Sequence, residues 1–182
     1  HKLVSGDGIK LLRDAGIQVD VGILEGKARS LNRRFITFHE AKRPYIILKW
    51  AQTSDGFIGR ETGDSGSPHI SGKLANIWVH HLRATVDGIF VGTQTAVQDN
   101  PGLTVRNVEG RSPHRFTIDL KNRIPSGHKL LTDGHATTVF AKSALSPNHV
   151  VLSDAEDTWA QVLDYWYKTG IQTVLIEGGT SI

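Results

Sequence analysis

The fold is decided by the stretch YIILKWA at residues 45–51, an apolar run that contains a single charged side chain. Two more runs of this kind follow, DGIFVG at residues 87–92 and TVLI at residues 173–176. Short apolar runs without alternation are typical of strands that are buried on both faces of a parallel sheet. Residues 115–119 and 137–141 are weaker strand candidates. The sequence therefore predicts a buried, mainly parallel sheet.

Helical patterns lie between these strands. Apolar residues at helical spacing predict helices over residues 71–83 and 153–168. Ser153 and Glu156 have the spacing of a capping box at the start of the second helix, and Gly170 is expected to end it. One face of that helix carries a stripe that we expect to pack in the core rather than to bind a cofactor: Trp159, Val162, Leu163 and Trp166. Alternating strands and helices predict an α/β fold, with a mostly parallel central sheet flanked by helices.

The opening third has the pattern of the end of another α/β domain. It predicts a helix over residues 6–16, a strand over residues 17–21 and a helix over residues 25–40. Pro44 marks a boundary, because the residue before a proline is disfavoured in the helical conformation. We therefore expect two parts, residues 1–42 and residues 43–182.

Composition limits the function classes. The 182-residue chain is 38% apolar and 21% charged, with a net charge of +3, which is typical of a globular protein. Lysine and arginine are scattered, so we expect an ordinary solvated surface rather than a nucleic-acid-binding face. No apolar run is long enough to span a membrane, and the start lacks a signal-peptide pattern.

Two residue types are missing from the chain. Cysteine is absent, which excludes disulfides and thiolate metal sites and fits a cytoplasmic protein. The histidines have no metal-binding spacing, so we expect no metal here. Methionine is also absent, the chain opens at His1, and it stops at Ile182 shortly after a glycine pair. We therefore expect it to be part of a longer protein.

Polar and glycine residues gather where three predicted strands end. Ala51 and Gln52 close the first strand, the segment GTQT at residues 92–95 follows the second, and EGGT at residues 177–180 follows the last. In open α/β sheets, ligands bind beyond the carboxyl ends of the strands. Glycine at such a place lets the backbone approach a phosphate. The three segments together predict a dinucleotide site, although a glycine pair alone can be a simple turn.

Three basic residues are candidates for chemistry. Arg83 and Arg106 come from separate elements, and two guanidinium forks suit the oxygens of one phosphate. Either could instead be an ordinary surface arginine. Lys49 lies inside an apolar strand, where it is either an edge residue that extends its ammonium to water or a group that donates a proton or binds a sugar oxygen.

From Arg43 onward the chain resembles the reductase domain of the bifunctional riboflavin-biosynthesis deaminase–reductase family (RibD, also called RibG). Residues 1–42 resemble the end of the deaminase domain of that family, so the resemblance covers nearly the whole chain. The matching segments are Leu48-Lys49, Ser54-Asp55-Gly56, Gly63-Asp64-Ser65, Leu82-Arg83-Ala84, Asp99-Asn100-Pro101, Leu103-Thr104-Val105-Arg106 and Glu177-Gly178-Gly179.

The resemblance implies a dihydrofolate-reductase-like fold and a specific reaction. In that reaction NADPH reduces 5-amino-6-(5-phosphoribosylamino)uracil, so that the ribosyl group becomes a ribityl chain. It also implies a homo-oligomer, dimer or tetramer. The full-length family member deaminates the preceding pyrimidine with a zinc ion, but the His-x-Glu and Cys-x-x-Cys ligands of that step are absent from this sequence.

The resemblance also assigns residues. The positions that match substrate contacts are Ser67, Arg83, Leu103, Arg106 and Glu177. The positions that match cofactor contacts are Ala51, His69, Thr95, Asp99, Gly179, Thr180, Ser181 and Ile182. Lys49 and Glu177 are the expected catalytic residues, with Lys49 polarising the substrate and donating a proton. The chain departs from the family at two cofactor positions, since many relatives carry tryptophan at His69 and a hydroxyl residue at Leu120.

Two alternatives stay open from the residues themselves. One is another dihydrofolate-reductase-like reductase, acting on a pterin or a different pyrimidine. The other is a non-catalytic nucleotide-binding module. Convergence of Lys49, Arg83, Arg106 and Glu177 within one pocket would favour the riboflavin-pathway reductase, whereas their dispersal over the surface would favour the non-catalytic module.

Overall fold

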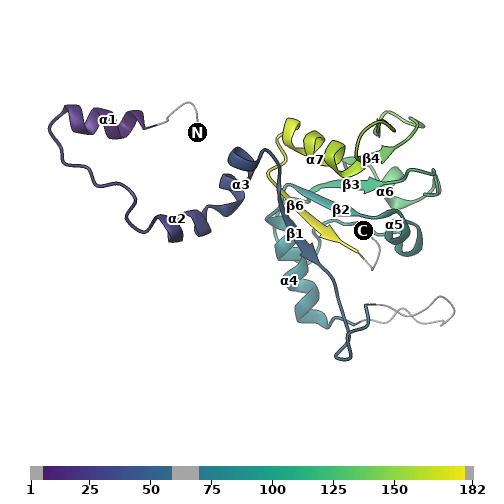
Figure 1. Ribbon diagram of the computed structural model, residues 1–182. Coiled ribbons are helices and arrows are strands. Elements are labelled where there is room, and N and C mark those ends of the chain that lie inside the picture. Colours follow the sequence, from purple (N-terminus) through teal and green to yellow (C-terminus); the bar gives the residue numbers. More distant parts are fainter. Residues whose placement is uncertain (1–5, 59–69, 179–182) are drawn as a thin grey trace.

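A six-stranded sheet forms the body of the protein (Figure 1). The computed structural model describes residues 6–58 and 70–178. All neighbouring strands run parallel, in the order β1-β6-β2-β3-β4-β5. The strands are β1 (Tyr45–Lys49), β2 (Gly88–Val91), β3 (His114–Ile118), β4 (Thr137–Ala141), β5 (His149–Val151) and β6 (Thr173–Glu177). The expected α/β architecture with a parallel central sheet is confirmed.

Helices cover both faces of this sheet. One face packs against α7, and the other packs against residues from α4, α5 and α6. The helices are α1 (Asp7–Asp14), α2 (Glu25–Leu31), α3 (Arg33–Ala41), α4 (Lys73–Ala84), α5 (Thr93–Asp99), α6 (Lys129–Thr132) and α7 (Thr158–Lys168). Because side chains alternate along a strand, one strand supplies both layers: Phe90 faces α7, whereas Ile89 and Val91 face α4.

The layer beneath α7 is aromatic. Trp166 has no exposed surface and meets Phe90 edge-on at 5.8 Å between ring centroids. Val162 is equally buried, and Trp159 and Leu163 pack against the same cluster. The predicted role of this helical stripe in the core is confirmed.

Three local predictions are wrong. Residues 17–21 form no strand, because none of the described strands lies beside them. The predicted helix over residues 25–40 is divided at Asn32 into α2 and α3. The predicted capping box is absent, because α7 starts only at Thr158, where the side chain of Asp157 accepts the N–H of Ala160 at 2.7 Å. Short elements at α5, α6 and β5 were not anticipated.

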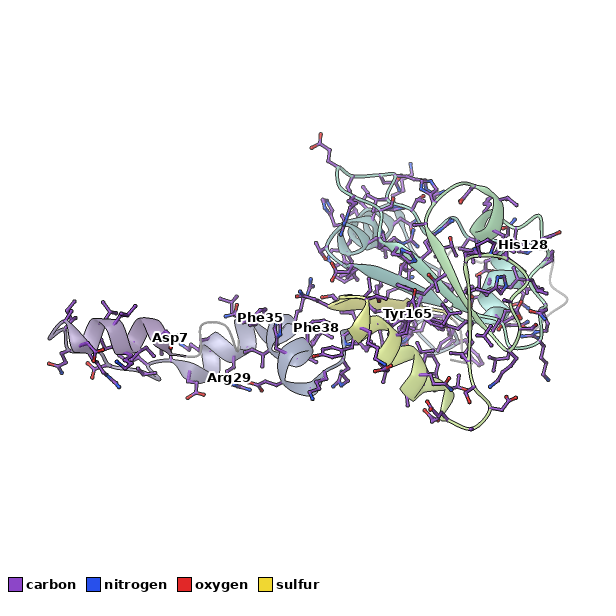
Figure 2. The ribbon with its side chains drawn as sticks, turned by 90° about the horizontal axis from the view of Figure 1, so that it is seen from above. Asp7, Arg29, Phe35, Phe38, His128 and Tyr165 are labelled. Carbon is purple, nitrogen blue, oxygen red and sulfur yellow. The ribbon has the colours of Figure 1, made fainter. Side chains whose placement is uncertain are left out.

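The first helices form an arm that extends away from the sheet (Figures 1 and 2). Neither α1 nor α2 has a buried residue, and apolar side chains such as Leu31, which is 84% exposed, face solvent. The arm joins the body through α3, whose Phe38 is buried and contacts the ring of Tyr167 on α7 at 5.0 Å. Nothing in the described ranges packs against the far end of the arm.

Within the described part of the chain, no helix has both the length and the apolar character needed to cross a bilayer.

Candidate active site

A buried ion pair ties α4 to the end of β6. The guanidinium of Arg83 donates from Nε to Oε1 of Glu177 at 2.8 Å and from Nη2 to Oε2 at 2.7 Å. Both side chains are almost buried, at 12% and 11% exposure. A two-point contact of this kind fixes direction as well as distance. The carboxylate is therefore held in one orientation at the carboxyl end of a central strand.

The same arginine also holds the loop after α5. Its Nη1 donates to the carbonyl oxygen of Thr104 at 3.3 Å. Next to Thr104, Leu103 adopts a left-handed backbone conformation with φ 53° and is 3% exposed. That conformation costs a residue other than glycine about 1–2 kcal/mol, so the surrounding contacts must hold it in place.

Side chains of the body supply those contacts, and two of them, Arg115 and His80, are buried. Arg115 donates to the carbonyl oxygen of Gly102 at 3.0 Å, and the hydroxyl of Ser112 accepts the N–H of Val105 at 3.0 Å. His80 accepts the N–H of Arg106 on its Nδ1 at 3.1 Å. The loop over residues 102–106 is therefore bound to the body on both sides of its strained residue.

Sequence reasoning missed His80. It is 5% exposed and lies three residues before Arg83, on the same face of α4. The three-residue spacing between His80 and Arg83 was the signal in the sequence. The adjacent His81 made it hard to tell which of the two histidines shares a face with Arg83. Burial lowers the pKa of His80, and the nearby charges of Arg83 and Arg106 lower it further. The ring is therefore kept neutral, which leaves Nδ1 free to accept the Arg106 N–H.

This pKa gives folding a pH dependence. Between the lowered pKa of folded His80 and the ordinary value near 6.5, the unfolded chain binds more protons, so stability falls as pH decreases through that window. His114, whose pKa burial also lowers, contributes in the same direction. We expect the midpoint of urea unfolding to fall between about pH 7.5 and pH 5, and to fall less in His80→Gln. Equal slopes in His80→Gln and the exposed control His81→Gln would contradict this role.

Lys49 lies beside the ion pair. It is aligned with Glu177 in the parallel pairing of β1 and β6, and strands so paired lie about 4.8 Å apart. Aligned residues on neighbouring parallel strands face the same side, so Lys49 and Glu177 share one face of the sheet. Lys49 is half-buried on a strand that borders the sheet as described, so both interpretations of this lysine remain compatible with its position.

The four charged residues lie near one another in the structure, although none of them lines a described pocket. Arg83 contacts Glu177, Lys49 is the strand neighbour of Glu177, and Arg106 lies two residues after Thr104, which Arg83 binds. The Arg106 side chain is exposed and folds back toward Gly102. Its predicted phosphate contact, like the other residue roles, stays a prediction.

The remaining predicted residues fall into three groups. Leu103 is a core residue beside α4 and β6. Ala51 follows β1, while Thr95 and Asp99 belong to α5 after β2, so all three belong to segments that follow a strand. Six predicted site residues lie outside the described residues: Ser67, His69, Gly179, Thr180, Ser181 and Ile182.

A separate pocket of about 300 Å³ opens where β2 and β3 end. It is lined by Phe90, Gly92, Thr93, Gln94, Ile118, Arg123 and Trp159. The hydroxyl of Thr93 donates to the carbonyl oxygen of Ile118, which joins the ends of the two strands. The described residues contain no group of histidine and carboxylate side chains arranged to hold a metal ion.

The chain matches a known family. A model described as the RibD C-terminal domain matches residues 44–182. The chain belongs to the RibD C-terminal domain family. The riboflavin biosynthesis protein RibD of Aquifex aeolicus is 37% identical over 179 residues, which are 98% of this chain and 46% of that protein.

Structural comparison agrees. The crystal structure of a diaminohydroxyphosphoribosylaminopyrimidine deaminase/5-amino-6-(5-phosphoribosylamino)uracil reductase from Thermotoga maritima matches with a TM-score of 0.82 and 36% identity, over 97% of this chain and 50% of that chain. A shorter relative, the 2,5-diamino-6-ribosylamino-4(3H)-pyrimidinone 5′-phosphate reductase of Aquifex aeolicus, is 30% identical over 78% of this chain and 69% of its own length. The chain spans about half the length of the RibD proteins it matches.

Proposed function

We propose that this chain reduces 5-amino-6-(5-phosphoribosylamino)uracil to its ribitylamino product with NADPH, as a step of riboflavin biosynthesis. The observation that carries the proposal is the buried Arg83–Glu177 pair at the carboxyl end of β6, with Lys49 and Arg106 beside it, in a chain of the RibD C-terminal domain family. A dispersed set of charges would have supported a non-catalytic module.

Each of the four charged residues has a separate role in the proposed reaction. Arg106 is exposed and its guanidinium has no described ion-pair partner, so it is available for the ribose phosphate. Glu177 anchors polar groups of the substrate, and Arg83 fixes the orientation of that carboxylate. Lys49 gives a proton to the ring oxygen of the sugar as the C1′–oxygen bond breaks, which leaves a cationic C1′–nitrogen double bond.

The residues present fit a nicotinamide dinucleotide. The carboxyl ends of β6 and β2 carry Gly178 and Gly92, where the backbone can approach a phosphate, and a 300 Å³ pocket lies next along the same edge. When bound, the nicotinamide supplies the hydride that C1′ accepts. The protein supplies position, and a well-oriented pair of reactants can account for much of the barrier reduction.

Several further statements belong to this proposal. Residues 1–42 would be the end of a deaminase-like domain, and the longer protein would carry the zinc-dependent deamination. Exposed apolar side chains on α4, on β1 and just after β1 support a homo-oligomer, dimer or tetramer: Leu48, Trp50, Leu74 and Trp78. A chain without cysteine fits the reducing cytoplasm. The substrate is a small phosphorylated molecule, and neither nucleic acid nor membrane is an expected partner.

Oxidation of NADPH in the presence of the phosphoribosylamino-uracil, followed at the absorbance of the reduced nicotinamide, tests the function. We expect Arg106→Ala to raise KM for this substrate about 10- to 100-fold, because one charge-assisted phosphate contact is lost. NADPH binding, measured by its fluorescence without substrate, should be nearly unchanged.

Arg111→Ala is the matched control, since Arg111 is an exposed arginine of the same connection with 80% of its side chain accessible. Equal loss of substrate and NADPH binding in Arg106→Ala would contradict the phosphate role. No substrate-dependent oxidation by the wild-type chain would contradict the proposed reaction.

A further inference from the structure

Two side chains of α4 hold the backbone that leads to Arg106. Arg83 donates to the carbonyl oxygen of Thr104 at 3.3 Å, and Nδ1 of His80 accepts the N–H of Arg106 at 3.1 Å. Residues three apart on a helix share a face, so one turn of α4 supplies both contacts. The helix thus binds one carbonyl group and one N–H group that lie two residues apart in the loop.

The N–H group between these two points is bound by a different segment. The hydroxyl of Ser112 accepts the N–H of Val105 at 3.0 Å. Successive N–H groups that go to different partners are typical of extended backbone, in which they point in alternate directions. The N–H groups of Val105 and Arg106 are therefore both fixed. The side chain of Arg106 starts from an anchored backbone, although its far end is exposed.

The chemical form of His80 suits this single contact. Because a backbone N–H can only donate, the Nδ1 that accepts it carries no proton, and the neutral ring has its proton on Nε2. Burial and the positive charges of Arg83 and Arg106 lower the pKa of His80, whereas the negative charge of Glu177 acts in the opposite direction. His80 is 5% exposed, and burial of a polar ring is unfavourable unless it makes a hydrogen bond. An apolar side chain could fill the same space, so the bond to Arg106 is what the histidine adds.

An anchored backbone matters for the proposed role of Arg106. A guanidinium binds two phosphate oxygens at once only when its planar fork arrives in the right direction. Ordering a long side chain on binding costs conformational entropy, and a ligand site that is already ordered avoids part of this cost. A fixed N–H at Arg106 limits the positions from which its side chain can start.

We propose that His80 is a positioning residue for the substrate phosphate: by holding the N–H of Arg106, it fixes the point from which the Arg106 guanidinium reaches that phosphate. The inference rests on the proposed function, in which Arg106 binds the ribose phosphate. His80 acts through Arg106 and not on the sugar or the pyrimidine. Its loss therefore weakens binding of a substrate that carries a phosphate and spares one that does not.

The test compares two ligands by titration calorimetry without NADPH: 5-amino-6-(5-phosphoribosylamino)uracil and the same compound without its phosphate. They are titrated into the wild-type chain, His80→Leu, His80→Asn and the control His81→Leu. His81 is the adjacent, exposed histidine. Leucine has no acceptor, whereas Oδ1 of asparagine is as many bonds from the backbone as Nδ1 of histidine and can accept the same N–H.

We expect His80→Leu to weaken the phosphorylated ligand about 3- to 10-fold, the effect of one lost neutral hydrogen bond, and to leave the other ligand nearly unchanged. His80→Asn should recover most of this loss, and His81→Leu should show none. In the NADPH oxidation assay, KM of His80→Leu should rise by the same factor with kcat nearly unchanged, because the phosphate contact is made equally in the ground state and the transition state.

The possible outcomes separate this inference from the reductase assignment. Equal weakening of both ligands in His80→Leu, no weakening, or a loss that His80→Asn does not recover would overturn the role of His80 even if the chain reduces its substrate. A preference for the phosphorylated ligand that depends on His80, in a chain that does not oxidise NADPH, would support the inference and contradict only the proposed reaction. A wild-type chain that binds neither ligand would overturn both. If His80→Leu does not fold, His80→Gln replaces it, since its amide lies one bond further from the backbone than Nδ1.

Discussion

Replacing Arg115 by methionine should lower the free energy of unfolding by about 3 kcal/mol or more, because each buried acceptor that loses its donor costs about 1–3 kcal/mol. Arg115 is 1% exposed and contacts both carboxylate oxygens of Asp133, at 2.6 and 2.8 Å. Its remaining donors reach the hydroxyl of Thr137 and the carbonyl oxygens of Gly102 and His135. Methionine fills part of the volume but donates to none of these acceptors. The carbonyl oxygen of His135 keeps the hydroxyl of Thr137 as a donor, and Oδ1 of Asp133 keeps the N–H of His135.

Urea unfolding followed by circular dichroism measures this change. Arg111→Met is the control, because it removes an exposed arginine whose contact with Asp87 is 3.9 Å long, and such surface pairs contribute little. If Arg115→Met does not fold, Arg115→Lys should fold with a smaller loss, since it keeps the charge. A loss in Arg115→Met no larger than that of the control would show that Arg115 is not a structural anchor.

The second large effect concerns Glu177. Changing it to glutamine removes the charge that holds Arg83 while keeping the shape of the side chain. We expect kcat/KM of the proposed reductase to fall about 100-fold, because misplacement of a positioned group by a small distance has that effect. The unfolding free energy should also fall, since Arg83 would remain almost buried without its counter-ion.

A double-mutant cycle separates the two contributions. Arg83→Met combined with Glu177→Gln should be less unstable than the sum of the single variants, because neither charge is then buried alone. Glu109→Gln, which removes an exposed carboxylate of the nearby connection, is the control for charge. Activity of Glu177→Gln close to that of this control would contradict a catalytic or anchoring role.

The sheet was largely predictable from the sequence because its strands are continuous apolar runs. The run from Ile89 to Val91 is fully buried, so its composition alone distinguishes it from surface segments. The same reasoning failed at residues 17–21, where apolar and polar residues alternate but no described strand lies alongside to pair with them. It also misplaced the start of α7, because Ser153 and Asp157 both have a side chain that can cap a helix and only the tertiary structure selects between them.

The site was less predictable, since its contacts join residues far apart in the chain. Arg83 and Glu177 are separated by 94 positions, and only the family resemblance connected them before the structure did. From its neighbours in sequence, Arg115 is predicted only to be the first residue of a strand. Nothing nearby in the sequence indicates that Asp133 forms an ion pair with it. His80 was not predicted as a site residue for the same reason, because the group that it binds is the backbone N–H of Arg106, 26 residues away.

The place of β6 in the sheet has a consequence for synthesis of the protein. This strand is the last described element, yet it lies between β1 and β2 and pairs with both. Among the described strands, only β6 pairs with β1, so while the chain leaves the ribosome this pairing must wait until more than 120 further residues have emerged, from Lys49 to Thr173. Such late, long-range pairing slows folding and leaves an apolar strand open to wrong partners. The nascent chain would therefore be a natural client for chaperones that shield unpaired strands.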